Sequence, residues 1–238
     1  MVRIVMAVAF LAWLFSATVS QATEFHRLVH NQRVIEYVLV LPDHFDKTAP
    51  YPVLLALPPG DQSKQLVEAG LHLYREAEAK KRGWVVISPA APEGESFYAG
   101  AENELPNLLD EISKLVLFEG GKAHLAGVSN GGLSAYRAIT EYPNRFLSLT
   151  VLPGIPPDDR AFSALDRLKG IPVAAFVGGE DSGWVRGSRE TKEKLDRLGI
   201  ENTLEVVSGE GHVVGLDPSK LFDLLDKRRQ KSMASHVR

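Results

Sequence analysis

At 238 residues the chain suits one sizeable domain, because two independent hydrophobic cores would each be small. Hydrophobic residues make up 45% and charged residues 24%, which argues against intrinsic disorder, and the net charge of −3 gives no general attraction for nucleic acid or anionic lipid. There are no cysteines, which excludes cysteine nucleophiles, disulfides, Cys-ligated zinc and a lipid anchor on cysteine.

The N-terminus has the pattern of a secretory signal. A basic residue precedes an apolar run from Ile4 to Phe15, and Ser20-Gln21-Ala22 places small residues where a signal peptidase reads them. We therefore predict a signal peptide over 1–22, one domain over 23–238, and export to the periplasm or beyond. Once the signal is removed we expect no stable membrane association. The alternative is an uncleaved anchor, because Val2 to Val19 approaches spanning length.

Strands and helices alternate along the rest of the chain. Two strands joined by a short turn are expected at Glu24–His30 and Arg33–Leu41. Short apolar runs predict further strands at Val53–Leu57, Trp84–Ser88, Ala123–Val128, Phe146–Leu152, Val173–Val177 and Leu204–Val207. Helices are expected at Lys64–Arg82, Asn103–Phe118 (with an apolar face that includes Leu115), Asn130–Tyr142, Phe162–Leu168, Arg186–Leu198 and Pro218–Arg229. This order predicts an α/β fold, with a mostly parallel central sheet, helices on both faces and an antiparallel N-terminal edge.

A G-x-S-x-G motif stands where the strand Ala123–Val128 meets the next helix. A chain that reverses from strand to helix within so few residues holds Ser129 in a strained conformation. Side chains two positions before and after the serine would collide, which requires Gly127 and Gly131. The turn would project the hydroxyl above the sheet, so we predict Ser129 as a catalytic nucleophile. The alternative is an ordinary glycine-rich turn with a solvated serine.

A serine hydroxyl attacks only when a base accepts its proton and a carboxylate orients that base. His212 follows the last predicted strand and is the expected base, with a solvated loop histidine as the alternative. The acid should follow the strand Val173–Val177, where Asp181 comes directly after a glycine-rich turn. Glu180 is a rival for this role, and Asp158 or Asp159 after the preceding strand are weaker ones.

An acyl-transfer site also needs backbone donors for the developing oxyanion. One should be the N–H of Asn130, directly after the nucleophile. The second should come from the loop after Val53–Leu57. Because Pro58 and Pro59 have no N–H, the donor there must be Gly60 or Asp61.

The chain resembles the α/β-hydrolase superfamily over about Glu24 to Arg229. The resemblance is carried, in family chain order, by the Gly127–Gly131 turn, Gly178-x-x-Asp181 and Gly211-His212. It is most similar to compact secreted bacterial serine esterases near the dienelactone-hydrolase, phospholipase/carboxylesterase and polyhydroxybutyrate-depolymerase-like groups. This implies cleavage of a small-molecule carboxylic ester through an acyl-enzyme, without metal or organic cofactor. Two departures are Pro58-Pro59, where the family often has His-Gly, and a serine where dienelactone hydrolases carry cysteine.

Only a short segment separates Phe146–Leu152 from Val173–Val177, the place where family members commonly insert a lid. We therefore predict no substantial cap and an accessible cleft. Candidate walls are Phe97 with Tyr98 and Ile155 with Trp184, although aromatic and apolar residues serve loop packing equally well. An acyltransferase or a peptidase would use the same triad, and a non-catalytic exported binding protein is the alternative from another class.

Overall fold

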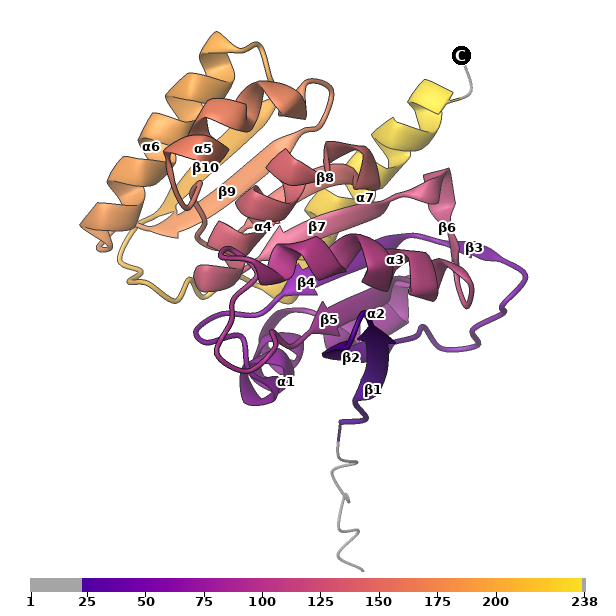
Figure 1. Ribbon diagram of the computed structural model, residues 1–238. Coiled ribbons are helices and arrows are strands. Elements are labelled where there is room, and N and C mark those ends of the chain that lie inside the picture. Colours follow the sequence, from indigo (N-terminus) through magenta and orange to yellow (C-terminus); the bar gives the residue numbers. More distant parts are fainter. Residues whose placement is uncertain (1–22, 237–238) are drawn as a thin grey trace, which may run out of the picture.

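The computed structural model describes residues 23–236, so the predicted signal and its possible membrane span lie outside the described residues. Eight strands form the main sheet in the order β1-β2-β5-β4-β7-β8-β9-β10 (Figure 1). Their bounds are β1 His26–His30, β2 Arg33–Val40, β4 Val53–Leu57, β5 Val85–Pro89, β7 Ala123–Gly127, β8 Phe146–Val151, β9 Val173–Gly178 and β10 Asn202–Val207. β2 runs antiparallel to both β1 and β5, whereas the other neighbours are parallel. The expected mostly parallel sheet with an antiparallel N-terminal edge is confirmed.

Helices cover both faces of this sheet (Figure 1). One face carries α1 Lys64–Tyr74, α2 Glu76–Arg82 and α7 Pro218–His236, and the other carries α3 Leu105–Ser113, α4 Asn130–Glu141, α5 Asp159–Ser163 and α6 Ser182–Arg197. β4 shows how one strand serves both layers. Val53, Leu55 and Leu57 belong to one buried cluster, and Leu54 and Ala56 belong to the other. Alternate side chains of a strand point to opposite faces, so a continuous apolar run is buried on both sides.

Several predicted helices differ in extent from the observed ones. α6 begins at Ser182 rather than Arg186, α7 reaches His236 rather than Arg229, and the helix expected at Phe162–Leu168 is α5 followed by a 3₁₀ segment. The helix expected at Lys64–Arg82 is interrupted at Arg75, where φ of −136° leaves the helical region and the side chain is buried. The helix expected to reach Phe118 ends at Ser113. Leu117–Phe118 instead form β6, which pairs with β3 (Pro50–Tyr51) in a separate two-stranded sheet. Leu115 lies beyond the helix and is 57% exposed, so it is not a core residue.

The connection from β8 to β9 contains only α5 and the 3₁₀ segment η4 (Ala164–Leu168). The prediction of no substantial cap is therefore confirmed. Four parallel strands end at the same edge of the sheet, and the loops that follow them carry the predicted site residues. Gly60 lies after β4, Ser129 after β7, Asp181 after β9 and His212 after β10. Ligand sites of open α/β sheets are found at this edge.

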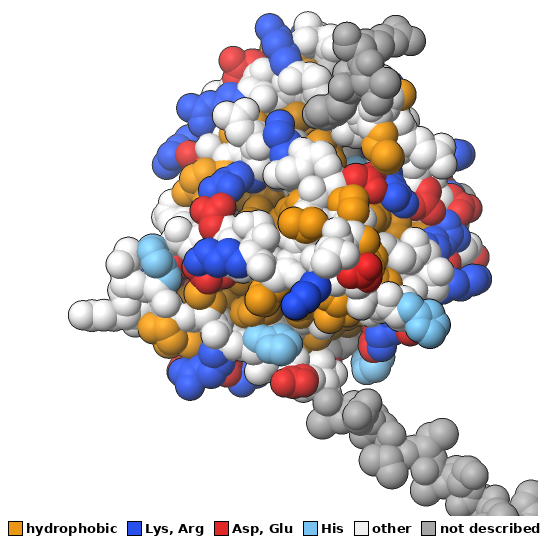
Figure 2. Space-filling model, turned by 90° about the vertical axis from the view of Figure 1, so that its right-hand side faces the viewer, with side chains coloured by type: hydrophobic (Ala, Val, Ile, Leu, Met, Phe, Trp, Pro, Cys, Tyr) orange, Lys and Arg blue, Asp and Glu red, His pale blue; other side chains and the backbone are white. Residues whose placement is uncertain are grey.

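The part of the chain that the structure describes has no membrane-spanning helix and, on the face drawn in Figure 2, no block of side chains of one charge. Within residues 23–236, no helix combines the length and the apolar character needed to cross a bilayer. Figure 2 shows lysine and arginine side chains mixed with acidic and apolar ones over that face.

Candidate active site

Ser129 occupies a strained turn between β7 and α4. Its φ of 55° and ψ of −117° lie outside the regions that residues with a side chain normally adopt. A Cβ on Gly127 would lie 2.0 Å from the Gly131 carbonyl oxygen, and a Cβ on Gly131 would lie 2.3 Å from the Leu57 carbonyl oxygen. The predicted need for both glycines is confirmed. The second collision is with the end of β4, so Gly131 also lets the start of α4 approach the loop that follows β4.

The three predicted side chains meet in one hydrogen-bonded chain. Ser129 Oγ lies 2.7 Å from His212 Nε2, and His212 Nδ1 lies 2.6 Å from Asp181 Oδ2. With Nδ1–H donating to the carboxylate, Nε2 is left to accept the serine proton. The His212 side chain is 42% exposed and that of Asp181 is 19% exposed. The imidazole is therefore open to solvent on one side while its orienting carboxylate is largely covered.

The loop of His212 is held against the end of β9. The Gly179 N–H donates to the Val207 carbonyl at 2.8 Å, and the Glu180 N–H donates to the Glu210 carbonyl at 3.0 Å. Gly178 makes this approach possible, because a Cβ there would lie only 1.8 Å from the Gly211 carbonyl oxygen. Two segments that are distant in sequence thus run side by side, and this places Asp181 within hydrogen-bonding distance of the His212 imidazole.

The rival acids lie elsewhere. Glu180 contributes its backbone N–H to the loop pairing and has an exposed side chain. Asp158 caps α5 by accepting from the Ala161 N–H at 2.9 Å, and it also pairs with the buried Arg137. The Ala161 hydrogen bond and Arg137 both hold the pKa of Asp158 below its ordinary value. Asp159, in the first turn of α5, is exposed. Of the four candidates, Asp181 is the one bonded to His212.

The loop after β4 is tied to the start of α4. The Asn130 side-chain amide donates to the Gly60 carbonyl at 2.8 Å, and Gly60 itself has a φ of +60° that favours glycine. As the first residue of α4, Asn130 has a backbone N–H with no intrahelical acceptor. Asp61 is exposed, and its carboxylate accepts from the Ser63 N–H at 3.0 Å, which lowers its pKa. This loop therefore lies beside the serine turn, the position required by the prediction that it supplies an oxyanion donor.

Gln62 is the residue of this loop that sequence reasoning missed. Its side chain is fully buried, donates to Ser134 Oγ at 2.9 Å and accepts from the Phe97 N–H at 2.8 Å. It also donates to the Pro58 carbonyl at 3.2 Å. Gln62 thus fixes the loop to α4 and to the segment after β5. No local pattern predicts this, because a single glutamine among polar loop residues reads as solvated.

The predicted walls of the cleft divide into two groups. Phe97 is fully buried in the core, so its side chain does not line an accessible cleft, and that expectation is wrong. Tyr98 is half-buried, and its carbonyl accepts from Arg137 Nε at 3.3 Å. Trp184 lies in the first turn of α6 with its ring centroid 5.2 Å from that of His212. Ile155 packs towards α6, since a Cβ on Gly187 would lie 3.0 Å from its Cδ1 atom. Trp184 is therefore the predicted wall that contacts the site.

The described part of the chain, residues 23–236, contains no group of three or more His, Asp or Glu side chains arranged to hold a metal ion.

Neither a protein-family model nor a curated protein sequence matches the chain. Among solved structures, a thermostable esterase is similar with a TM-score of 0.72 at 16% identity, over 86% of this chain and 62% of that one. A ferulic acid esterase gives a TM-score of 0.71 at 18% identity, over 87% of this chain and 97% of that one.

This chain has the α/β-hydrolase fold.

The same α/β-hydrolase fold extends to proteins of other activities. Dipeptidyl peptidase 4 of Porphyromonas gingivalis matches with a TM-score of 0.65 at 14% identity, over 89% of this chain but 35% of that one. The chain thus spans less than two thirds of the thermostable esterase and about a third of the peptidase. At sequence identities this low, structural similarity shows that two proteins share a fold, but it does not show that they share a substrate.

Proposed function

We propose that this protein is a serine hydrolase that cleaves small carboxylic esters through an acyl-enzyme. The observation that carries the proposal is the continuous hydrogen-bonded chain from Asp181 through His212 to Ser129. These three residues lie at the edge of the sheet where this fold places ligands, and the serine is held in a strained turn. The esterases among its structural neighbours support the same reaction class.

In this mechanism Ser129 Oγ attacks the ester carbonyl carbon while His212 Nε2 takes the hydroxyl proton. Asp181 holds the imidazole in the required tautomer and stabilises the imidazolium that forms. The Asn130 N–H and an N–H of Gly60 or Asp61 would donate to the oxyanion. His212 then protonates the leaving alcohol, and water activated by the same imidazole releases the acid and restores Ser129.

Turnover of p-nitrophenyl acetate tests the proposal. We expect wild-type protein to hydrolyse it and Ser129→Ala to lose activity by about 10³-fold or more. Ser208→Ala is the matched control, because it removes an exposed hydroxyl from the loop before His212 and should leave the rate unchanged. A fluorophosphonate probe should label wild type but neither Ser129→Ala nor His212→Ala. Equal rates in wild type and Ser129→Ala would refute the proposal, and unlabelled, inactive wild type would favour a binding protein.

Acyl transfer and peptide cleavage would use the same three side chains. Product analysis with an added alcohol or amine separates transfer from hydrolysis, because a transferase forms the new ester or amide. Release of p-nitroaniline from a panel of dipeptide p-nitroanilides tests whether the protein is a peptidase. Free acid as the sole product, with no cleavage of the anilides, is the result we expect.

We further propose that the protein acts outside the cytoplasm, on the basis of the sequence pattern over 1–22. N-terminal sequencing of the protein recovered from a secreting host should begin at Thr23. An intact N-terminus in the membrane fraction would favour the uncleaved anchor instead.

A further inference from the structure

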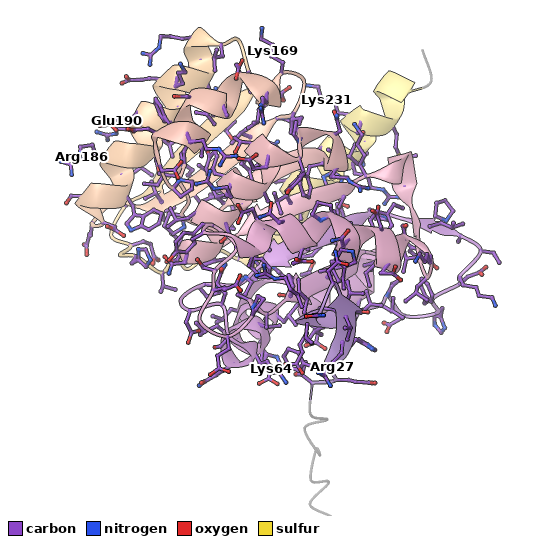
Figure 3. The ribbon with its side chains drawn as sticks, viewed as in Figure 1. Arg27, Lys64, Lys169, Arg186, Glu190 and Lys231 are labelled. Carbon is purple, nitrogen blue, oxygen red and sulfur yellow. The ribbon has the colours of Figure 1, made fainter. Side chains whose placement is uncertain are left out.

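A cavity lies at the opposite edge of the sheet from the serine. It has a volume of about 500 Å³ and is formed by the segments that precede β7, β8, β9 and β10 together with α7. Lys122 lies directly before β7, whereas Ser129 lies just after that strand, so the full length of β7 separates the cavity from the active site. Figure 3 shows Lys169 and Lys231, two of its lining residues, towards the same upper end of the molecule.

The charge of the cavity lining is strongly unbalanced. The cavity is lined by one acidic side chain, Glu201, and by five cationic side chains, which are Lys122, Arg167, Lys169, Arg228 and Lys231. Glu201 already pairs with Lys231. Within residues 23–236, Lys122, Arg167 and Lys169 have no ion-pair partner. The cavity therefore collects positive charge in a protein whose net charge is negative.

Arg228 is the decisive residue of this lining. It is only 8% exposed, and its Nε and Nη1 atoms have no hydrogen-bond partner among the described residues. A buried guanidinium with unpaired donors is costly, because desolvation of a charge is offset only by an opposite charge and by hydrogen bonds. Burial accordingly lowers the pKa of Arg228 to about 10, partly opposed by Glu201, which leaves the group charged at neutral pH.

We propose that this cavity binds a small organic anion, with the Arg228 guanidinium as the central ligand of a phosphate or carboxylate group. The planar fork of an arginine suits such groups, and the rim lysines add charge. Leu147, Ile171 and Pro172 also line the cavity and are each partly exposed, so it offers apolar surface beside the cations. The ligand should therefore be an anionic group joined to an apolar body rather than a bare inorganic ion.

Calorimetric titration of the purified protein with phenyl phosphate, benzoate and inorganic phosphate tests the proposal, at a fixed ionic strength of about 0.15 M. We expect one saturable site, with phenyl phosphate or benzoate bound more tightly than inorganic phosphate. The better of the two aromatic ligands identifies the preferred anionic group. Tightest binding by inorganic phosphate would contradict the apolar part of the proposal. Absence of saturable binding up to about 10 mM of all three would refute the site.

Arg228→Met keeps an apolar side chain of similar length and removes the charge. It should weaken binding by about tenfold or more while the unliganded protein unfolds at an unchanged or higher temperature. Lys47→Gln is the matched control, since it removes an exposed charge from a residue that does not line the cavity, and its affinity should equal that of wild type. If Arg228→Met does not fold, the double variant Lys122→Gln/Lys169→Gln should show the loss. Undiminished affinity in the folded variant tested would overturn the proposal.

The active site must be excluded as the place of binding. Protein whose Ser129 is blocked with a fluorophosphonate, or the Ser129→Ala variant, should bind the same anion with unchanged affinity. Loss of binding in both would place the anion beside the serine and overturn the second site. This readout does not depend on whether the protein hydrolyses esters, so the two proposals can fail separately.

Discussion

Gly178 offers the sharpest test of how the site is assembled. It lies at the end of β9, where an added methyl group would stand 1.8 Å from the Gly211 carbonyl oxygen. Carbon and oxygen atoms in non-bonded contact stay about 3.3 Å apart, so Gly178→Ala must push the two loops apart by about 1.5 Å. Those loops carry Asp181 and His212, whose hydrogen bond is 2.6 Å long. A displacement of this size in a reacting group costs on the order of 10²-fold in rate.

We therefore expect Gly178→Ala to lower kcat/KM for p-nitrophenyl acetate by about 10²-fold while costing only about 1–3 kcal/mol of stability. Gly183→Ala is the matched control. It lies five residues further along in the first turn of α6, where an added Cβ meets nothing within 4 Å, and alanine favours the helix. Thermal unfolding checks that both variants fold. Activity of Gly178→Ala within about twofold of that of Gly183→Ala would refute the reasoning.

Three further variants probe separate parts of the structure. Asp181→Asn should lower kcat by about 10³- to 10⁴-fold with the fold retained, as seen by steady-state kinetics beside circular dichroism, because the imidazole loses its orienting acceptor. Asn130→Ala removes the bond to the Gly60 carbonyl but keeps the backbone N–H, so kcat should fall about tenfold with KM nearly constant. Burial lowers the pKa of His124 to about 3, so the folded protein leaves it neutral while the unfolded chain protonates it near pH 6.5. The contribution of His124 to the free energy of unfolding should thus be complete above pH 6.5 and should decrease towards pH 3 by up to about 1.4 kcal/mol per pH unit. Denaturant titrations over this pH range should show a smaller slope for His124→Gln than for wild type.

The parts of the fold that the sequence predicted well are those with a strong local signal. β4 and β7 are short apolar runs bounded by proline or glycine, and the turn at Ser129 carries its glycines at fixed spacing. Asp181 follows β9, a strand of this pattern, and His212 follows β10, which has a weaker apolar signal. Both could be predicted because chain order restricts where parallel strands end.

The features that were missed depend on contacts between distant segments. β3 and β6 are two residues each and exist only because Pro50–Tyr51 meets Leu117–Phe118 across the fold. The interruption at Arg75 buries a charged side chain inside an otherwise helical pattern. Gln62 gains its role from partners 72 and 35 residues away. None of these contacts changes local composition or periodicity, so a reading of local patterns does not detect them.

The partial exposure of His212 bears on what an intermediate at Ser129 would encounter. Because no lid lies between β8 and β9, an acyl group bound to Ser129 Oγ would be accessible to water for as long as it exists. Water is then always the most abundant nucleophile at hand, and a competing acceptor would need a binding surface of its own to prevail. A short-lived intermediate, discharged to the free acid before it can accumulate, is the kinetic behaviour that a partly exposed serine without a lid favours.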